Sequence, residues 1–160
     1  RLTLARALVN DPEFIFLDEP TTGLDPQARH LIWERLRRLQ DTNKTLLLTT
    51  HFMEEAERLC NRVAIMDNGQ IIAIGTPATL VTECIEKEVV EIYGADIENW
   101  LASRQSLYDR YEQFGQLAYC YSNDAIALVQ ALQAEGRNFT HRPANLEDVF
   151  LRLTGRDLRE

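Results

Sequence analysis

The chain has 160 residues, of which 45% are hydrophobic, and a formal net charge of −8. That length allows one core, or a half-domain with a small appendage. The acidic balance argues against general nucleic-acid binding and gives no reason to expect attraction to anionic lipid. No apolar run approaches the length of a membrane span, so any membrane association is expected to come through a partner. The three cysteines are expected to be buried free thiols.

The most informative early segment is a short apolar run, residues 14–17, that ends in Asp18 and Glu19. Such a run predicts a strand buried on both faces, as in a parallel sheet. Because burying charge is costly, we expect both carboxylates just beyond the strand's carboxyl end, where ligands bind in open α/β folds. Two carboxylates there suit a hydrated Mg²⁺ and an attacking water, which is the chemistry of nucleotide hydrolysis.

A turn, a helix and a second strand follow. Residues 21–26 predict a turn, and residues 27–40 carry apolar side chains close to helical spacing. Residues 45–50 predict a second buried strand, which ends at His51. The order strand, helix, strand predicts a βαβ unit with a right-handed crossover. The polar ends of both strands then fall on the same edge of the sheet, and this convergence predicts an active site.

The next segments are expected to complete the edge of this sheet without chemistry of their own. Residues 52–59 predict a short acidic helix. Its acidic side chains are expected on a solvated face: Glu54, Glu55 and Glu57. Residues 62–67 and 70–75 predict a hairpin, because the turn between them tolerates positive φ. Residues 76–81 then predict a short helix.

Composition changes near residue 82, and residues 82–160 are expected to form a small α+β appendage after a first domain of residues 1–81. Its expected elements are strands at 89–93 and 116–121, helices at 97–107 and 124–135, and a last helix after Asn145. The many aromatic residues of this segment could form a ligand platform, and core packing is their expected use.

Up to about residue 80 the chain resembles the nucleotide-binding subunit of ABC transporters. Residues 14–18 resemble the Walker B strand, Glu19 matches the catalytic glutamate, and His51 matches the switch histidine. Residues 23–25 resemble the D-loop, and residues 1–8 resemble the helix after the signature loop. The combination is specific, whereas any one piece alone would not be.

The resemblance implies a role for each of these residues. Asp18 would bind the ATP cofactor through Mg²⁺ and a coordinated water, and Glu19 would polarise the attacking water. His51 would contact the γ-phosphate and link it to Glu19 and to the dimer partner. The D-loop residues would lie at the interface of two head-to-tail subunits: Gly23, Leu24 and Asp25. Purely structural roles for three of these residues stay open: Asp18 could cap a turn, His51 could be a hydrogen-bonded structural residue, and Asp25 could start a helix.

The chain lacks the phosphate-binding motif that the family pattern includes. No Gly-x-x-x-x-Gly-Lys-Ser/Thr motif occurs in it, and it begins inside an apparent helix. We therefore expect a partial P-loop NTPase fold of class α/β, a parallel sheet with flanking helices, from the carboxyl-terminal portion of a longer ATPase. Without the phosphate cradle, these 160 residues are expected not to hydrolyse ATP alone.

Residues 49–60 and 145–155 resemble the drug-export and nodulation-factor-export branch of the family. This resemblance implies a homodimeric cytoplasmic ATPase that uses ATP and Mg²⁺. It would be bound to the inner face of the cell membrane through a separate ABC-2-type permease, with no nucleic-acid partner and no membrane insertion of its own. Two alternatives stay open: an ABC ATPase without a transporter, and a non-catalytic dimerisation or regulatory module.

Overall fold

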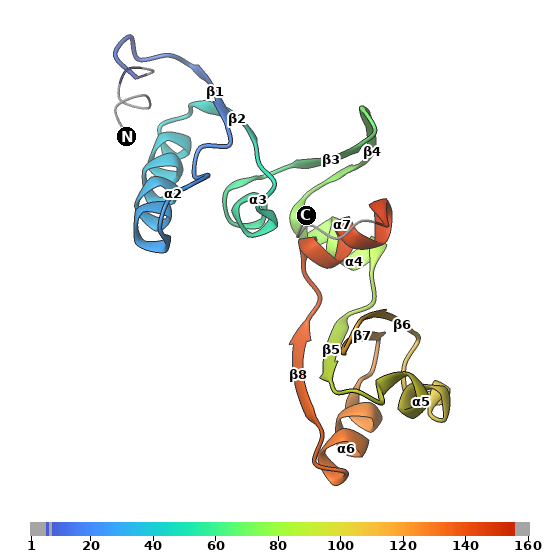
Figure 1. Ribbon diagram of the computed structural model, residues 1–160. Helices are drawn as coiled ribbons and strands as arrows, with labels where there is room; N and C mark the ends of the chain where they lie inside the picture. The colour runs from blue at the N-terminus through green and yellow to red at the C-terminus, as the bar shows by residue number, and fades with distance from the viewer. Residues whose placement is uncertain (1–5, 7, 156–160) are drawn as a thin grey trace. The chain divides into compact units, whose positions relative to one another are not determined.

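The computed structural model describes residue 6 and residues 8–155 (Figure 1). The chain divides into two compact units, Arg1–Val63 and Ala64–Glu160. This structural division falls at the start of a strand, whereas the sequence division at residues 81 and 82 follows composition and stays a prediction. The helix expected over residues 1–8 lies mostly outside the described residues.

The first unit is built on a strand–helix–strand arrangement. Its elements are β1 (Phe14–Asp18), α2 (Pro26–Asp41), β2 (Thr45–Thr49) and α3 (Met53–Leu59). The strands β1 and β2 pair in parallel, with Phe14 opposite Thr45 at one end and Asp18 opposite Thr49 at the other. The predicted βαβ order is therefore confirmed, and both strands end at the same edge.

Only one face of this two-stranded sheet is covered by described residues. On that face α2 contributes Ile32, Trp33 and Leu36 to a core with Leu17, Leu46 and Leu48. On the other face Phe14, Phe16 and Leu47 are 63%, 76% and 61% exposed. The prediction of strands buried on both faces is wrong for the described residues, because α2 packs against one side alone.

The second unit begins with a hairpin. The strands β3 (Val63–Asp67) and β4 (Gln70–Gly75) pair with each other, as predicted. They are joined through Asn68 and Gly69, both of which have positive φ. The helix α4 (Pro77–Cys84) follows, capped by the Thr76 hydroxyl, which accepts a hydrogen bond from the Thr79 N–H.

The rest of the second unit is a four-stranded antiparallel sheet with helices. The strands, in the spatial order β6-β7-β5-β8, are β6 (Arg110–Phe114), β7 (Leu117–Ser122), β5 (Glu88–Tyr93) and β8 (Asn138–Pro143). The helical segments are α5 (Ile97–Ala102), the 3₁₀ turn η1 (Gln105–Leu107), α6 (Ile126–Ala134) and α7 (Leu146–Thr154). Two strands, β6 and β8, were not expected from the sequence. The helix expected over residues 97–107 is split into α5 and η1.

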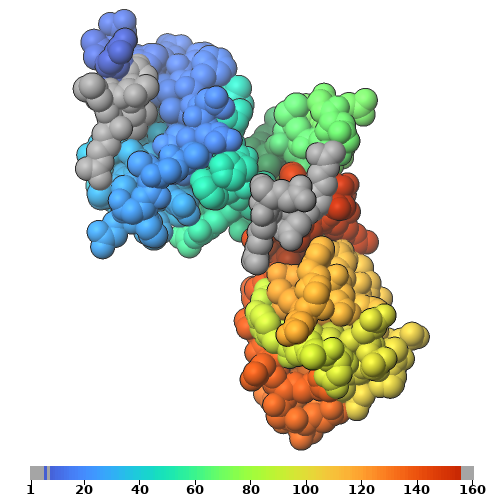
Figure 2. All heavy atoms as spheres, in the orientation of Figure 1, coloured from blue at the N-terminus to red at the C-terminus, as the bar shows by residue number. Residues whose placement is uncertain are grey.

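One face of this sheet packs against α5 and α6. The buried side chains are Val90, Ile92, Ala118 and Cys120 from the sheet, with Ile97, Trp100, Leu101, Ala125, Leu128 and Leu132 from the helices and the segments leading into them. In Figure 2 the atoms of β5, α5 and α6 form one continuous mass. The helices α4 and α7 lie side by side (Figure 1). None of the described helices is long and apolar enough to span a membrane.

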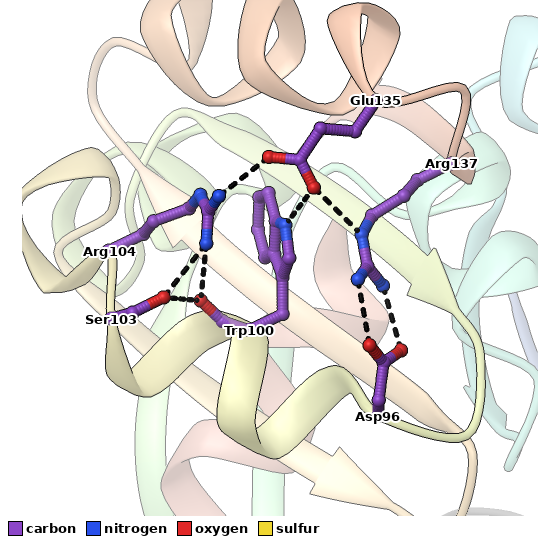
Figure 3. Close-up of polar contacts among 6 residues, drawn as sticks. All are labelled: Asp96, Trp100, Ser103, Arg104, Glu135 and Arg137. Atoms are coloured by element: carbon purple, nitrogen blue, oxygen red, sulfur yellow. Dashed lines mark hydrogen bonds and ion pairs between the residues drawn. The ribbon is translucent and has the colours of Figure 1, made fainter.

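A polar network surrounds Trp100 where α5 meets the end of α6 (Figure 3). The indole N–H of Trp100 donates to Glu135 at 2.6 Å, and the guanidinium groups of Arg104 and Arg137 lie 4.5 and 5.1 Å from the ring centroid. Arg137 also donates two hydrogen bonds of 3.0 Å to Asp96. The indole hydrogen bond lowers the pKa of Glu135, and Arg137 lowers the pKa of Asp96. The network therefore favours the ionised carboxylates.

Candidate active site

Hydrogen bonds between the ends of β1 and β2 fix the predicted acidic pair. The Thr49 hydroxyl donates to Oδ1 of Asp18, its partner across the sheet. The Glu19 N–H donates to the Thr49 carbonyl at 3.0 Å and lies 3.4 Å from the Thr49 hydroxyl. Both carboxylates are thus held at the carboxyl ends of parallel strands, where open α/β sheets bind ligands.

Glu19 has an uncommon backbone conformation. Its φ of 43° lies in the left-handed region, which costs a non-glycine residue roughly 1–3 kcal/mol. The side chain is held at both oxygens: Oε2 accepts from the Thr22 hydroxyl at 3.0 Å, and Oε1 lies 3.2 Å from Nδ1 of His51. Strain of this kind concentrates at functional sites, so the conformation is a second reason to place chemistry here.

His51 completes the predicted set. Its imidazole packs against the Phe52 ring, with centroids 4.1 Å apart, and the Arg29 guanidinium lies 4.5 Å from the centroid of the same Phe52 ring. The side chains of Glu19 and His51 are 46% and 50% exposed, so a ligand could reach both. The predicted convergence of Asp18, Glu19 and His51 is confirmed in position, and their individual roles stay predictions.

The three predicted D-loop residues lie in the turn between β1 and α2. Gly23 has a φ of 75°, a conformation that glycine adopts without a steric cost. Leu24 packs against the α2 core. Asp25 caps α2, since its Oδ1 accepts from the Ala28 N–H at 2.8 Å. The helix-start role of Asp25 is therefore confirmed, and a role of this turn at a subunit interface stays a prediction.

The acidic pair fits a weakly ligated hard cation rather than a dedicated metal cage. No group of three or more His, Cys, Asp or Glu side chains suited to a metal ion occurs among residues 6 and 8–155. Magnesium is commonly held by one or two carboxylates together with waters and substrate phosphates. Asp18 is exposed and can serve as such a ligand, whereas both oxygens of Glu19 already have protein partners.

One acidic side chain near the site was missed by the sequence analysis. Glu55 is fully buried, so the expectation that it lies on a solvated face is wrong, while Glu54 and Glu57 are exposed as expected. The signal was its spacing: Glu55 lies four residues before the buried Leu59, on the same stripe of α3.

Two cavities of the described part of the chain lie away from the predicted site residues. In the described part of the chain, a cavity of about 270 Å³ is lined by residues that include Glu91, Tyr119 and Arg142. A second, of about 380 Å³, is lined by residues 11, 13 and 14 and 42–45. No predicted site residue lines either cavity, so the geometry of the strand ends, and not pocket size, identifies the site.

Two protein families and several curated proteins are similar to this chain. The family described as "AAA domain, putative AbiEii toxin, Type IV TA system" matches residues 1–55, and "Nodulation factor export protein NodI, C-terminal domain" matches residues 98–155. Proteins named "Nod factor export ATP-binding protein I" are similar over the whole or nearly the whole chain. The identity is 54% for Ralstonia nicotianae, 53% for Rhizobium etli and 54% for Mesorhizobium japonicum, covering 52%, 51% and 47% of those proteins.

This similarity identifies the chain as a homologue of ABC-type ATP-binding proteins. More narrowly, it is a homologue of the Nod factor export ATP-binding proteins I. It spans about half the length of these curated relatives.

Proposed function

We propose that the parent protein of this chain is an ATP-hydrolysing subunit of an ABC exporter, with a P-loop NTPase fold. The observation that carries the proposal is the meeting of Asp18, Glu19 and His51 at the ends of β1 and β2. It is supported by 54% identity to a protein named for Nod factor export. A parallel sheet normally has both faces covered, so the exposed face around Phe16 fits a parent longer than this chain.

In this mechanism Glu19 orients the attacking water and accepts its proton. The carboxylate can do so because Thr22 and His51 fix both of its oxygens, so little reorganisation is needed at the moment of reaction. Asp18 would hold Mg²⁺ together with phosphate oxygens of ATP, and the ion would neutralise charge on the phosphates. Positioning and electrostatics dominate phosphoryl transfer, which suits a site made of fixed polar side chains.

The hydrogen bond of His51 restricts how this residue can help. If Nδ1 donates its proton to the Glu19 carboxylate, a neutral imidazole has only a lone pair at Nε2. A phosphate oxygen is an acceptor, so a direct contact from Nε2 to the γ-phosphate requires the imidazolium form. In that form His51 would donate to Glu19 and to the phosphate at the same time, and link the base to the group that is transferred.

The proposed setting is a homodimer on the inner face of the cell membrane, bound to a separate ABC-2-type permease. The turn with Gly23, Leu24 and Asp25 would lie at the interface between the two ATPase subunits. This turn leaves Gly23 and Asp25 exposed, which an interface role requires. ATP would bring the subunits together, hydrolysis would separate them, and the permease would convert this motion into export.

The proposal is tested by Glu19→Gln in the full-length parent protein. Glutamine keeps the size of the side chain but cannot take a proton, so kcat for Mg²⁺-dependent ATP hydrolysis is expected to fall on the order of 10²-fold or more. ATP binding, measured by equilibrium titration, is expected to be preserved. Co-purification of the parent with a multi-span membrane protein tests the transport setting.

The matched control is Glu54→Gln, which removes an exposed carboxylate of α3 and should leave kcat unchanged. A Glu19→Gln protein that turns over ATP at the normal rate would refute the role given to Glu19. A parent protein with no Mg²⁺-dependent ATPase activity would refute the proposed function itself.

A further inference from the structure

A buried carboxylate lies directly behind the candidate site. The Glu55 side chain has no exposed surface, and its Oε1 accepts from the Thr21 hydroxyl at 2.9 Å and from the Trp33 indole N–H at 3.0 Å. Its Oε2 is buried and has no hydrogen-bond partner among the described residues. Burying a carboxylate is costly even when it is hydrogen-bonded. An acid at this position is therefore expected to have a role that an apolar side chain could not fill.

The first partner, Thr21, belongs to the turn that carries Glu19. Thr21 is itself fully buried. Two backbone hydrogen bonds of 3.2 Å tighten this turn, from the Thr22 N–H to the Glu19 carbonyl and from the Leu24 N–H to the Thr21 carbonyl. A shift of Thr21 would therefore move the strained backbone of Glu19, two residues earlier.

The carboxylate itself belongs to the helix that follows His51. Glu55 lies in the first turn of α3, and His51 precedes it by four residues. One oxygen atom thus joins the turn of Glu19 to the segment of His51. The contact between these two side chains, 3.2 Å from Oε1 to Nδ1, depends on both segments keeping their places.

The second partner, Trp33, has a different relation to the site. It lies in the middle of α2, is 4% exposed, and packs with Ile32, Leu36 and Leu59 in the core. Its hydrogen bond anchors Glu55 to this core and does not involve the turn that carries Glu19. The two donors to this oxygen therefore have different roles: Trp33 connects Glu55 to the core, and Thr21 connects it to the turn that carries Glu19.

We infer that Glu55 is a positioning residue of the site, which holds the turn of Glu19 against the segment of His51 through the Thr21 hydroxyl. The inference rests on the proposed ATPase function. Glu55 does not touch the reacting atoms and acts through the placement of Glu19. Small misplacements of catalytic groups can lower rates by about 10²-fold, so a weak hydrogen bond at this point can have a kinetic effect larger than its effect on stability.

The test compares Thr21→Val and Trp33→Phe in the full-length parent protein. Each substitution removes one donor to Oε1 of Glu55. Thr21→Val nearly preserves the shape of the side chain, whereas Trp33→Phe keeps an aromatic ring of smaller volume. Both are expected to lower the melting temperature. Only Thr21→Val is expected to lower kcat, on the order of 10-fold, with KM for ATP changed less than about twofold. Trp33→Phe is expected to keep kcat within about twofold of the wild type.

A second comparison tests rescue at position 55. The amide oxygen of Glu55→Gln can accept from both donors, so this variant should keep most of the wild-type kcat, whereas Glu55→Ala should lose about as much as Thr21→Val. Glu54→Ala, one residue earlier on the exposed side of α3, is the matched control. In a Glu19→Gln background, Thr21→Val should cause no further loss, because the group it positions is already inactive.

The outcomes separate the two proposals. If the wild-type parent hydrolyses ATP and Thr21→Val and Trp33→Phe have equal kcat values, Glu55 is a structural residue and the inference alone is overturned. If the wild-type parent has no ATPase activity, the proposed function fails and the inference fails with it. If Glu55→Ala does not fold, the comparison of Thr21→Val with Trp33→Phe still decides.

Discussion

The two units of this chain differ in where their apolar side chains lie. In the second unit the sheet and its helices enclose side chains with no exposed surface, such as Val90, Leu101 and Leu128. In the first unit the sheet is covered on one face, and Phe14 and Phe16 are exposed on the other. The four-stranded sheet of the second unit and its helices therefore enclose a complete core, although the hairpin of β3 and β4 exposes Ile71 and Ile74. The first unit has an apolar face that its own described residues do not cover.

Polar groups differ between the units in the same way. In the second unit Asp148 is buried and accepts two hydrogen bonds from Arg142 at 2.7 and 2.9 Å. In the first unit Asp18, Glu19 and His51 are exposed, while only Glu55 behind them is buried. The comparison predicts that substitutions in the enclosed core of the second unit cost more stability than substitutions on the exposed face of the first.

The largest effect should come from the core of the second unit. Leu128→Ala removes a fully buried side chain and leaves a cavity, so the free energy of unfolding should fall by about 2–5 kcal/mol. In the first unit, Phe16→Ala changes a side chain that is 76% exposed and should stay within about 0.5 kcal/mol. Urea unfolding of the 160-residue chain measures both changes.

Each unit has its own reporter for this measurement, because Trp33 lies in the first and Trp100 in the second. A chain with Trp33→Phe reports the unfolding of the second unit through Trp100 alone. If Phe16→Ala destabilised the chain as much as Leu128→Ala, the exposed face would be covered in solution and the contrast between the units would be wrong.

A smaller effect is expected at the ion pair of the second unit. Asp148 is 1% exposed and also accepts from the Asn145 N–H at 2.9 Å in a capping box. Burial works against the charge of Arg142, but the hydrogen bonds to Asp148 and Glu91 outweigh it and raise the pKa of Arg142. Asp148→Asn keeps one acceptor but loses the charge, and should lower the free energy of unfolding by about 2 kcal/mol.

The control is Glu147→Gln, one residue earlier in the first turn of α7, which should cost less than about 1 kcal/mol. Equal losses for the two variants would mean that helix-terminal charge, and not the buried pair with Arg142, explains the effect.

The candidate site could be predicted from the sequence because the evidence for it was local and topological. A short apolar run that ends in Asp18 and Glu19, and a second that ends in His51, place three polar side chains at one edge once the strands are parallel. The register that sets Asp18 opposite Thr49 then follows from the pairing. No information from distant parts of the chain was needed for this step.

The structural features that the sequence did not predict depend on residues that are distant in the chain and that a local sequence pattern does not include. The strands β6 and β8 are the edges of their sheet, and their side chains are exposed or half-buried, so their sequences lack a clear apolar alternation. The burial of Glu55 depends on Thr21 and Trp33, which are 34 and 22 residues away. The exposure of Phe14 and Phe16 depends on which other residues cover the sheet. The sequence of the strand itself does not contain that information.

The smallest effect concerns pH and tests the fixed networks of the second unit. The indole N–H of Trp100 lowers the pKa of Glu135, so this carboxylate contributes stability that is fully present above the pKa of an unfolded glutamate and is lost as the pH falls through the lower folded pKa. Glu135→Gln should be less stable than the wild type at pH 6, and this difference should shrink as the pH falls below about 4.

Urea unfolding at pH 6 and at a pH below about 4, followed by Trp100 fluorescence in a Trp33→Phe chain, measures the difference in the free energy of unfolding. Glu98→Gln, at an exposed position of α5, is the control. A difference between wild type and Glu135→Gln that stayed constant with pH would show that the hydrogen bonds of Glu135 do not depend on its charge, and the network in Figure 3 would then be a packing feature rather than an electrostatic one.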